Sequence, residues 1–207
     1  YDEITSSIQF LSGLIHGIMA DGTLSDKEIA ALRSWIETND FLAGTYPFDE
    51  INSLLYAVLE DKKISEAERE ELMAFFSNII DFKNSLNLTE RQFSDLREKY
   101  SIKGICAVCP EITFKGKQFC FTGESYRCKR SEFAAVVESL GGKCTSSVSK
   151  KTDYLVVGNG GNPCWAYSCY GRKIEQAMNL RKDGAPVIIV NETDFWDAVE
   201  DVKAGIV

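Results

Sequence analysis

The spacing of hydrophobic residues changes near position 114. Before it, apolar residues recur every three or four positions, as at Ile8, Leu11 and Ile15, which is typical of amphipathic helices. After it, "KQFCFTG" (117–123) alternates around Phe119 and Phe121, and "TDYLVVG" (152–158) is a continuous apolar run of the kind found in strands buried on both faces. The pattern therefore predicts a helical first half and a second half that contains strands.

The first half contains an internal repeat. "MADGTLSDKEIAALRSWI" (19–36) and "LEDKKISEAEREELMAFF" (59–76) superimpose at an offset of 40 residues. Each copy has a serine followed three residues later by a glutamate, which is the capping box that begins a helix. We expect residues 4–99 to form an all-α bundle of four to six helices. The two predicted boxes are Ser25 with Glu28 and Ser65 with Glu68.

The second half alternates strand and helix signals in the order βαββαβα. Strand-like runs include "PVIIV" (186–190), and a helical stripe in "ETDFWDAVEDV" (192–202) follows it. The simplest topology is a small four-stranded parallel sheet flanked by three helices. We therefore predict a domain at 1–99, a linker at 100–113 and a domain at 114–207. The linker is apolar, so part of it should pack against one domain.

The two halves differ in charge. Residues 1–100 have a net charge of −10, whereas residues 101–207 have +2. The acidic half should repel nucleic acid, so that only the second half could bind it. No apolar run approaches the length of a membrane span, and seven irregularly spaced cysteines are typical of reduced thiols inside a cell. The first residue is Tyr1 rather than Met, as expected of a fragment.

Four segments of the second half carry a family resemblance. "KGKQFCFTG", "GGKCTSSVSKKTDYLVVG", "YGRKIEQA" and "VIIVNETDFWDAV" follow one another in order over 115–202. They resemble a BRCT domain, most closely that of bacterial NAD-dependent DNA ligases and of the replication factor C large subunit. The insertion "NGGNPCWAYSCY" (159–170) is longer than the corresponding loop of ligase-type domains, and Trp196 matches the family's last-helix tryptophan only approximately.

The acidic half has a weaker resemblance. Its Asp-Gly-x-Leu-Ser-x-x-Glu turn is similar to that of TerB-like helical domains. The same turn resembles part of a calcium-binding loop, but Gly17 and Met19 occupy the first and third ligand positions, where oxygen donors are needed. We therefore expect two capped helices rather than a calcium site. The sequence does not identify the protein partner of this half.

A phosphate site follows from the BRCT resemblance. In "FCFTGESYRCKRSEF" (119–133), cations lie just before a helix N-terminus. The partial positive charge of that N-terminus disfavours cations. The positions that match the phosphate pocket of the family are Thr122, Gly123, Arg130 and Lys173. A hydroxyl, a backbone N–H and two cations can bind phosphate oxygens together. Solvated charges that keep the domain soluble are the alternative. Further contacts to DNA or peptide are expected from Arg127, Lys129, Lys150, Lys151 and Arg172.

The resemblance favours a binding protein rather than an enzyme. Nucleotidyl transfer by ligases needs Lys-x-Asp-Gly, and the nearest string here, Lys182-Asp183-Gly184, lacks the spacer. We expect an adaptor in DNA replication or repair in the bacterial cytoplasm, with the nucleoid as an alternative location. Its ligand is a 5′-phosphorylated DNA end or a phosphoprotein bound near Trp165, Tyr167 and Tyr170. The third alternative is that the domain docks a partner protein independently of phosphate.

The cysteines suggest one metal hypothesis. Cys106 and Cys109 form a CxxC pair, and Cys164 and Cys169 lie in the insertion. Four thiolates could hold zinc and join the linker to the insertion. The spacing of the second pair is irregular for such a site, so we expect no metal and no organic cofactor.

Overall fold

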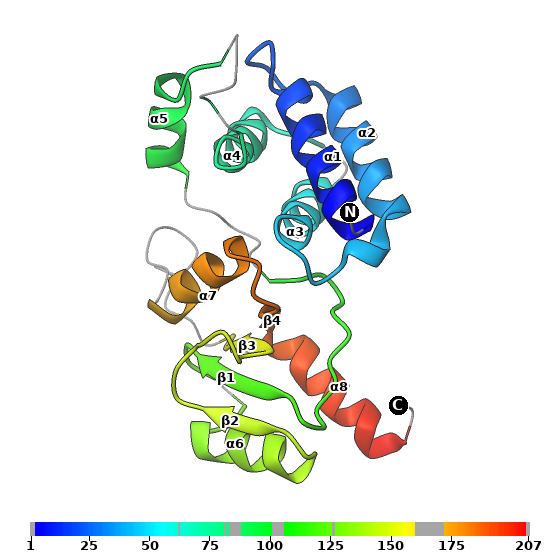
Figure 1. Cartoon of the computed structure of the whole chain (residues 1–207), viewed down its shortest axis with the longest axis vertical. Helices are drawn as coiled ribbons and strands as arrows, with labels where there is room; N and C mark the ends of the chain where they lie inside the picture. Colours follow the sequence, from blue (N-terminus) through cyan, green and yellow to red (C-terminus); the bar gives the residue numbers. More distant parts are fainter. Residues whose placement is uncertain are drawn as a thin grey trace. The chain divides into compact units, whose positions relative to one another are not determined.

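A computed structural model describes most of the chain, namely residues 3–61, 63–80, 82, 88–100, 106–125, 127–159 and 172–205. The chain divides into two compact units (Figure 1). The first unit contains Tyr1–Leu42 and Glu50–Gly104, and the second contains Ala43–Asp49 and Ile105–Val207.

The first unit is helical, as the spacing of apolar residues predicts. Its described residues form five α-helices and one short 3-10 helix. Aliphatic side chains such as Leu11, Ile15, Ile29 and Leu32 are fully buried in its core. The elements are α1 (Glu3–Ile18), α2 (Asp26–Thr38), η1 (Asp40–Leu42), α3 (Phe48–Leu59), α4 (Glu66–Phe76) and α5 (Arg91–Lys99).

The two predicted capping boxes are both present. In α2, the Ser25 hydroxyl accepts a hydrogen bond from the Glu28 N–H, and the Glu28 carboxylate accepts one from the Ser25 N–H at 2.8 Å. Ser65 and Glu68 repeat this arrangement in α4. Each box satisfies two backbone N–H groups that the first helical turn leaves without intrahelical partners. Local sequence therefore fixes where both helices begin.

The second unit contains a four-stranded parallel sheet, as predicted. Its strand order is β2-β1-β3-β4, and each neighbouring pair is parallel. The order of elements along the chain is βαββαβα, which confirms the expected topology. The elements are β1 (Gln118–Thr122), α6 (Arg130–Ser139), β2 (Lys143–Thr145), β3 (Tyr154–Val157), α7 (Arg172–Lys182), β4 (Ile188–Asn191) and α8 (Glu192–Ala204).

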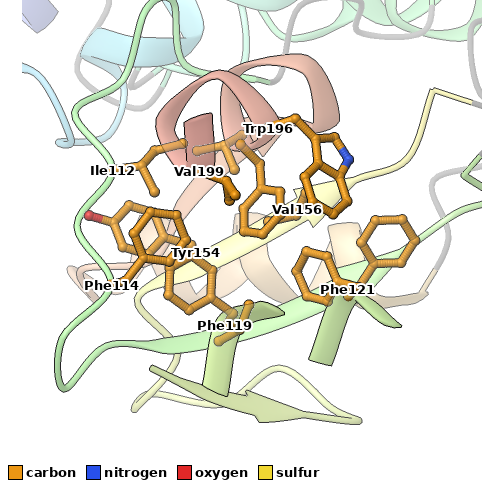
Figure 2. Close-up of a cluster of buried hydrophobic side chains, with 12 residues drawn as sticks. Ile112, Phe114, Phe119, Phe121, Tyr154, Val156, Trp196 and Val199 are labelled. Carbon is orange, nitrogen blue, oxygen red and sulfur yellow. The ribbon is translucent and has the colours of Figure 1, made fainter. Parts of the chain in front are cut away.

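Helices cover both faces of this sheet. Phe119 and Phe121 of β1 pack on one face with Phe133 of α6 and Phe195 of α8. Figure 2 shows Trp196 and Val199 of α8 above the strand residue Val156 in this cluster. On the other face, Cys120 and Leu155 belong to a separate cluster with residues of α7, including Ile174 and Ala177. Because side chains alternate along a strand, neighbouring residues of β1 serve different cores.

Two further segments, Ile105–Lys117 and Ala43–Asp49, also belong to the second unit, and the latter includes the first two residues of α3. The Ala107 N–H donates a hydrogen bond to the Ile189 carbonyl at 2.7 Å, and Ala107 and Ile112 are buried. This confirms that part of the predicted linker packs against a domain. In Ala43–Asp49, the Asp49 carboxylate lies 3.0 Å from the Arg181 guanidinium, and both side chains are buried. Burial raises the pKa of the Asp49 carboxyl, although Arg181 acts in the opposite direction.

Candidate functional site

The carboxyl end of β1 lies against the end of β3. The Gly158 N–H donates to the Thr122 carbonyl at 2.9 Å, directly after the last paired residues of the two strands. Gly123 has a φ of +80°, which L-residues with a side chain rarely adopt. A Cβ atom there would also lie 3.4 Å from the Gly158 nitrogen. The Thr-Gly pair therefore makes a sharp turn that a bulkier residue would strain.

Arg130 and Lys173 meet the main chain at this turn. Arg130 is the first residue of α6, and its guanidinium donates to the Gly123 carbonyl at 3.3 Å. Lys173 is the second residue of α7, and its ammonium donates to the Phe121 carbonyl at 2.8 Å. The two carbonyls flank Thr122 in sequence. The structure thus brings the cations of two separate helices to the end of one strand.

An anion would be a stronger hydrogen-bond acceptor for Arg130 and Lys173 than these two carbonyls. Neutral carbonyl groups are weaker partners for cations than phosphate or carboxylate oxygens. Arg130 is exposed, and Lys173 is partly buried. Each also lies in the first turn of a helix, where the helix dipole favours an anion over a cation. The arrangement can bind an anion that accepts hydrogen bonds from both side chains. Thr122, which is buried, lies between the two contacted carbonyls in sequence.

Glu192 connects the loops on either side of this turn. Its side chain is buried at the start of α8, although carboxylates are seldom fully buried without partners. One oxygen accepts hydrogen bonds from the Ser125 hydroxyl and from the Trp196 indole N–H, and the other accepts the Asn159 N–H at 2.8 Å. The Ser125 hydroxyl in turn accepts the N–H groups of Arg127 and Cys128. Glu192 therefore holds the loop after β1 to the loop after β3.

Gly158 and Glu192 were not foreseen from the sequence. A Cβ atom on Gly158 would lie 2.2 Å from the Glu124 carbonyl oxygen and 2.9 Å from the Phe121 ring. The glycine that ends "YLVVG" was the available signal, because a glycine after a buried strand often marks a close backbone approach. Glu192 carried no such signal, because an acidic residue in the first turn of a helix is ordinary.

The five cations predicted to make further contacts with DNA or peptide do not lie together. Arg127 is engaged by α8, since its guanidinium pairs with Glu200 and lies 4.7 Å from the centre of the Trp196 ring. Lys129 is the N-cap of α6 and Arg172 begins α7, so both lie close in sequence to the site cations. Lys150 and Lys151 are exposed in the turn before β3.

That turn lies at the other edge of the sheet. Asp153 follows it, and its N–H donates to the carbonyl of Gln118, the first residue of β1. The Asp153 carboxylate also pairs with Lys117 at 2.9 Å. Because the strands are parallel, this is the amino-terminal edge, whereas Arg130 and Lys173 lie at the carboxyl end of β1. Lys150 and Lys151 are therefore separated from the predicted pocket.

Part of the predicted chemistry lies outside the described residues. These are Cys164 and Cys169 of the zinc hypothesis, and the aromatic residues Trp165, Tyr167 and Tyr170 of the insertion. Of the other two thiols, Cys109 is exposed and Cys106 is partly buried. Burial raises the pKa of the Cys106 thiol to about 12, with a smaller contribution from Asp194.

The acidic turn of the first unit is held by its own hydrogen bonds. The Thr23 N–H and hydroxyl both donate to Asp21, which lowers the pKa of that carboxyl. In the second copy, the Lys63 N–H donates to Asp61 at 2.9 Å. Within the described residues, no group of three or more His, Cys, Asp or Glu is arranged to hold a metal ion. Nor do those residues include a helix with the length and apolar character needed to cross a membrane.

Comparison with known proteins identifies the second half of the chain. Residues 109–197 match the family model described as "BRCA1 C Terminus (BRCT) domain". The chain is also similar to DNA ligases of Persephonella marina (40% identical over 91 residues, 44% of this chain and 11% of the ligase), Fervidobacterium nodosum (35% over 133 residues, 62% and 16%) and Anoxybacillus flavithermus (32% over 152 residues, 69% and 20%). The chain therefore spans at most about a fifth of the length of these relatives.

Proposed function

We propose, taking as the premise that residues 109–197 form a BRCT domain, that this domain recognises a terminal phosphate and serves as a non-catalytic adaptor in DNA replication or repair. One observation carries the proposal. Arg130 and Lys173 come from different helices and both reach the carboxyl end of β1, on either side of Thr122. In parallel α/β sheets, ligands commonly bind at this edge. The predicted pocket of Thr122, Gly123, Arg130 and Lys173 is the proposed site.

The charge of the site suits a phosphomonoester. A terminal phosphate carries a charge of about −1.5 to −2 at neutral pH, whereas a phosphodiester carries one negative charge. Two cations at one strand end match the higher charge. The net charge of +2 over residues 101–207 is small for a protein that coats duplex DNA, which favours recognition of an end.

We propose a 5′-phosphorylated DNA end as the ligand. The relatives are named DNA ligases, so DNA is the natural polymer to test first. We assign no catalytic step to the chain, since its sequence lacks Lys-x-Asp-Gly. Its proposed location is the bacterial cytoplasm or nucleoid, and the proposed partner of the acidic helical unit is a protein.

A charge-matched pair of double variants tests the proposal. Binding of a fluorescent DNA hairpin, with or without a 5′-phosphate, is followed by anisotropy across a salt series. One variant is Arg130→Ala with Lys173→Ala, and the control is Lys150→Ala with Lys151→Ala, which removes the same charge from the opposite edge of the sheet. Two charge-assisted hydrogen bonds should make the phosphorylated hairpin bind at least about tenfold more tightly.

The outcomes separate the site from bulk charge. The proposal expects the first variant to lose the preference for phosphate and the control to keep it, with only a weaker salt dependence. Equal loss in both variants would show that general positive charge drives binding. If wild-type protein ignores the 5′-phosphate but binds a phosphoserine peptide, the ligand is a phosphoprotein and the DNA-end assignment fails.

A further inference from the structure

A groove in the first unit lies between the two repeat copies. It has a volume of about 680 Å³, which is within the range of small-ligand and peptide-side-chain pockets. The turn that begins α2 forms one side, α4 forms the opposite side, and Leu96 of α5 adds to the lining. The lining residues are Gly22, Thr23, Leu24, Ser25, Asp26, Lys27, Glu66, Arg69, Glu70, Met73 and Leu96.

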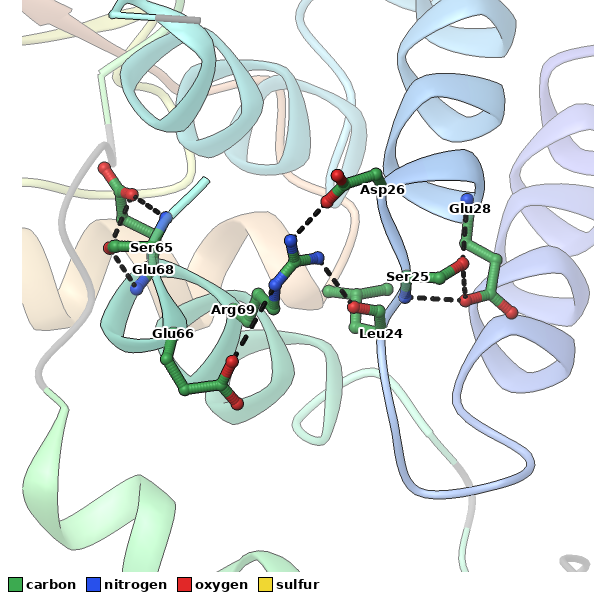
Figure 3. A network of polar contacts seen from close by, with 8 residues as sticks. All are labelled: Leu24, Ser25, Asp26, Glu28, Ser65, Glu66, Glu68 and Arg69. Atoms are coloured by element: carbon green, nitrogen blue, oxygen red, sulfur yellow. Dashed lines mark hydrogen bonds and ion pairs between the residues drawn. The ribbon is translucent and has the colours of Figure 1, made fainter. Parts of the chain in front are cut away.

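Arg69 spans the two copies of the repeat. At the 40-residue offset it corresponds to Ile29, which is fully buried in the core. Arg69 instead reaches the first copy, where its guanidinium donates to the Leu24 carbonyl at 2.8 Å and pairs with Asp26 (Figure 3). Its side chain is 19% exposed. The two copies therefore have the same capping boxes but differ at Arg69, which connects the second copy to the first beside the groove.

The groove combines apolar lining with an acidic surrounding. Leu24, Met73 and Leu96 supply apolar surface. The side chains of Asp26 and Glu66 are 74% and 84% exposed, so they remain accessible although both pair with Arg69. Among the lining residues, the three carboxylates of Asp26, Glu66 and Glu70 outnumber the two cations, Lys27 and Arg69. An occupant that complements this groove is cationic and carries an apolar side chain.

We propose that this groove binds a basic peptide segment that inserts an apolar side chain, such as leucine, between flanking Lys or Arg residues. Apolar contact with Met73 and Leu96 would supply affinity, and the acidic rim would select the charge of the partner and speed its encounter. Nucleic acid is excluded as the occupant by the net charge of −10 over residues 1–100. The proposal is independent of the phosphate site in the second unit.

Three labelled peptides test it on the full chain. The first alternates Lys with Leu over nine residues, the second replaces each Leu by Ser, and the third replaces each Lys by Glu. We expect the Lys-Leu peptide to bind at least tenfold more tightly than either of the others, because each of those lacks one of the two required features. Absence of saturable binding of the Lys-Leu peptide, or equal binding of the Lys-Ser peptide, would overturn the proposal.

A matched pair of protein variants locates the binding. Asp26→Asn with Glu66→Gln removes two carboxylates from the rim, and Glu3→Gln with Asp40→Asn removes two exposed carboxylates that do not line the groove. The rim variant should bind the Lys-Leu peptide at least fivefold more weakly, and the control should bind as wild type does. A second groove variant, Met73→Lys, should also lose binding, with folding checked by circular dichroism. Equal losses in rim and control variants would overturn the proposal.

Discussion

Two polar clusters, one from each unit, differ in how far apart along the chain their partners lie. In the helical unit, Ser25 and Glu28 cap a helix from three residues apart and are solvent-exposed. In the BRCT unit, Glu192 is buried and bonds to Ser125 and Asn159, which are 67 and 33 residues away. The comparison shows that local polar pairs set where helices begin, whereas long-range buried pairs set how loops are held beside a site.

The largest expected difference between the units concerns their ion pairs. Asp49→Ala removes the carboxylate from the buried Arg181 guanidinium, which should cost roughly 3–5 kcal/mol of unfolding free energy. Glu37→Ala breaks the exposed pair with Arg33 in α2 and should cost at most about 0.5 kcal/mol. Urea unfolding of both variants measures the difference. Similar small losses would contradict the account of Asp49 as part of the second unit.

A second comparison uses one substitution at two glycines. Gly158→Ala places a Cβ atom 2.2 Å from a carbonyl oxygen, so we expect a loss of roughly 1–3 kcal/mol or more. Gly13→Ala adds a Cβ atom in α1 with nothing within 4 Å, and should stabilise the helix by about 0.5–1 kcal/mol. Thermal melts of the two variants should shift in opposite directions. An unchanged melting temperature for Gly158→Ala would show that the two strand ends are less closely packed.

High pH should destabilise the second unit through Cys106. Its folded-state pKa of about 12 lies above the ordinary value of 9.0. The neutral thiol therefore contributes stability that is fully present below pH 9 and is lost as pH rises toward 12, by at most about 1.4 kcal/mol per pH unit. Other groups also titrate in this range, so wild type is compared with Cys106→Ala by urea unfolding at pH 8, 9 and 10. Parallel curves would contradict the assignment.

Small effects of opposite sign are expected at two helix caps. Lys129 is the N-cap of α6 without a side-chain cap bond, unlike Ser65 in α4. Lys129→Ser should therefore stabilise the protein by about 0.5–1 kcal/mol, while Ser65→Ala should destabilise it by about 1 kcal/mol. If the cations serve a ligand, Lys129→Ser should also weaken binding of the phosphorylated hairpin. Unchanged binding would assign Lys129 to the solvated surface.

The sequence predicted the features that depend on neighbouring residues. Both capping boxes, the four-stranded parallel sheet and the alternation of Phe119 and Phe121 followed from periodicity and local motifs. The arrangement of Arg130 and Lys173 came from the family resemblance, since no local pattern relates residues 43 positions apart. Glu192 and the Asp49–Arg181 pair could not be foreseen, because a buried carboxylate is recognisable only once its distant partners are known.

The central claim is that the carboxyl end of β1 binds a terminal phosphate, and amide chemical shifts test it most directly. The ¹⁵N-labelled protein is titrated with the hairpin carrying a 5′-phosphate and, as reference, with the 5′-hydroxyl form. The account expects phosphate-dependent shifts at Gly123, Arg130 and Lys173 and none at Lys150 and Lys151. Identical shifts with both hairpins, or phosphate-dependent shifts confined to the Lys150–Lys151 turn, would contradict it.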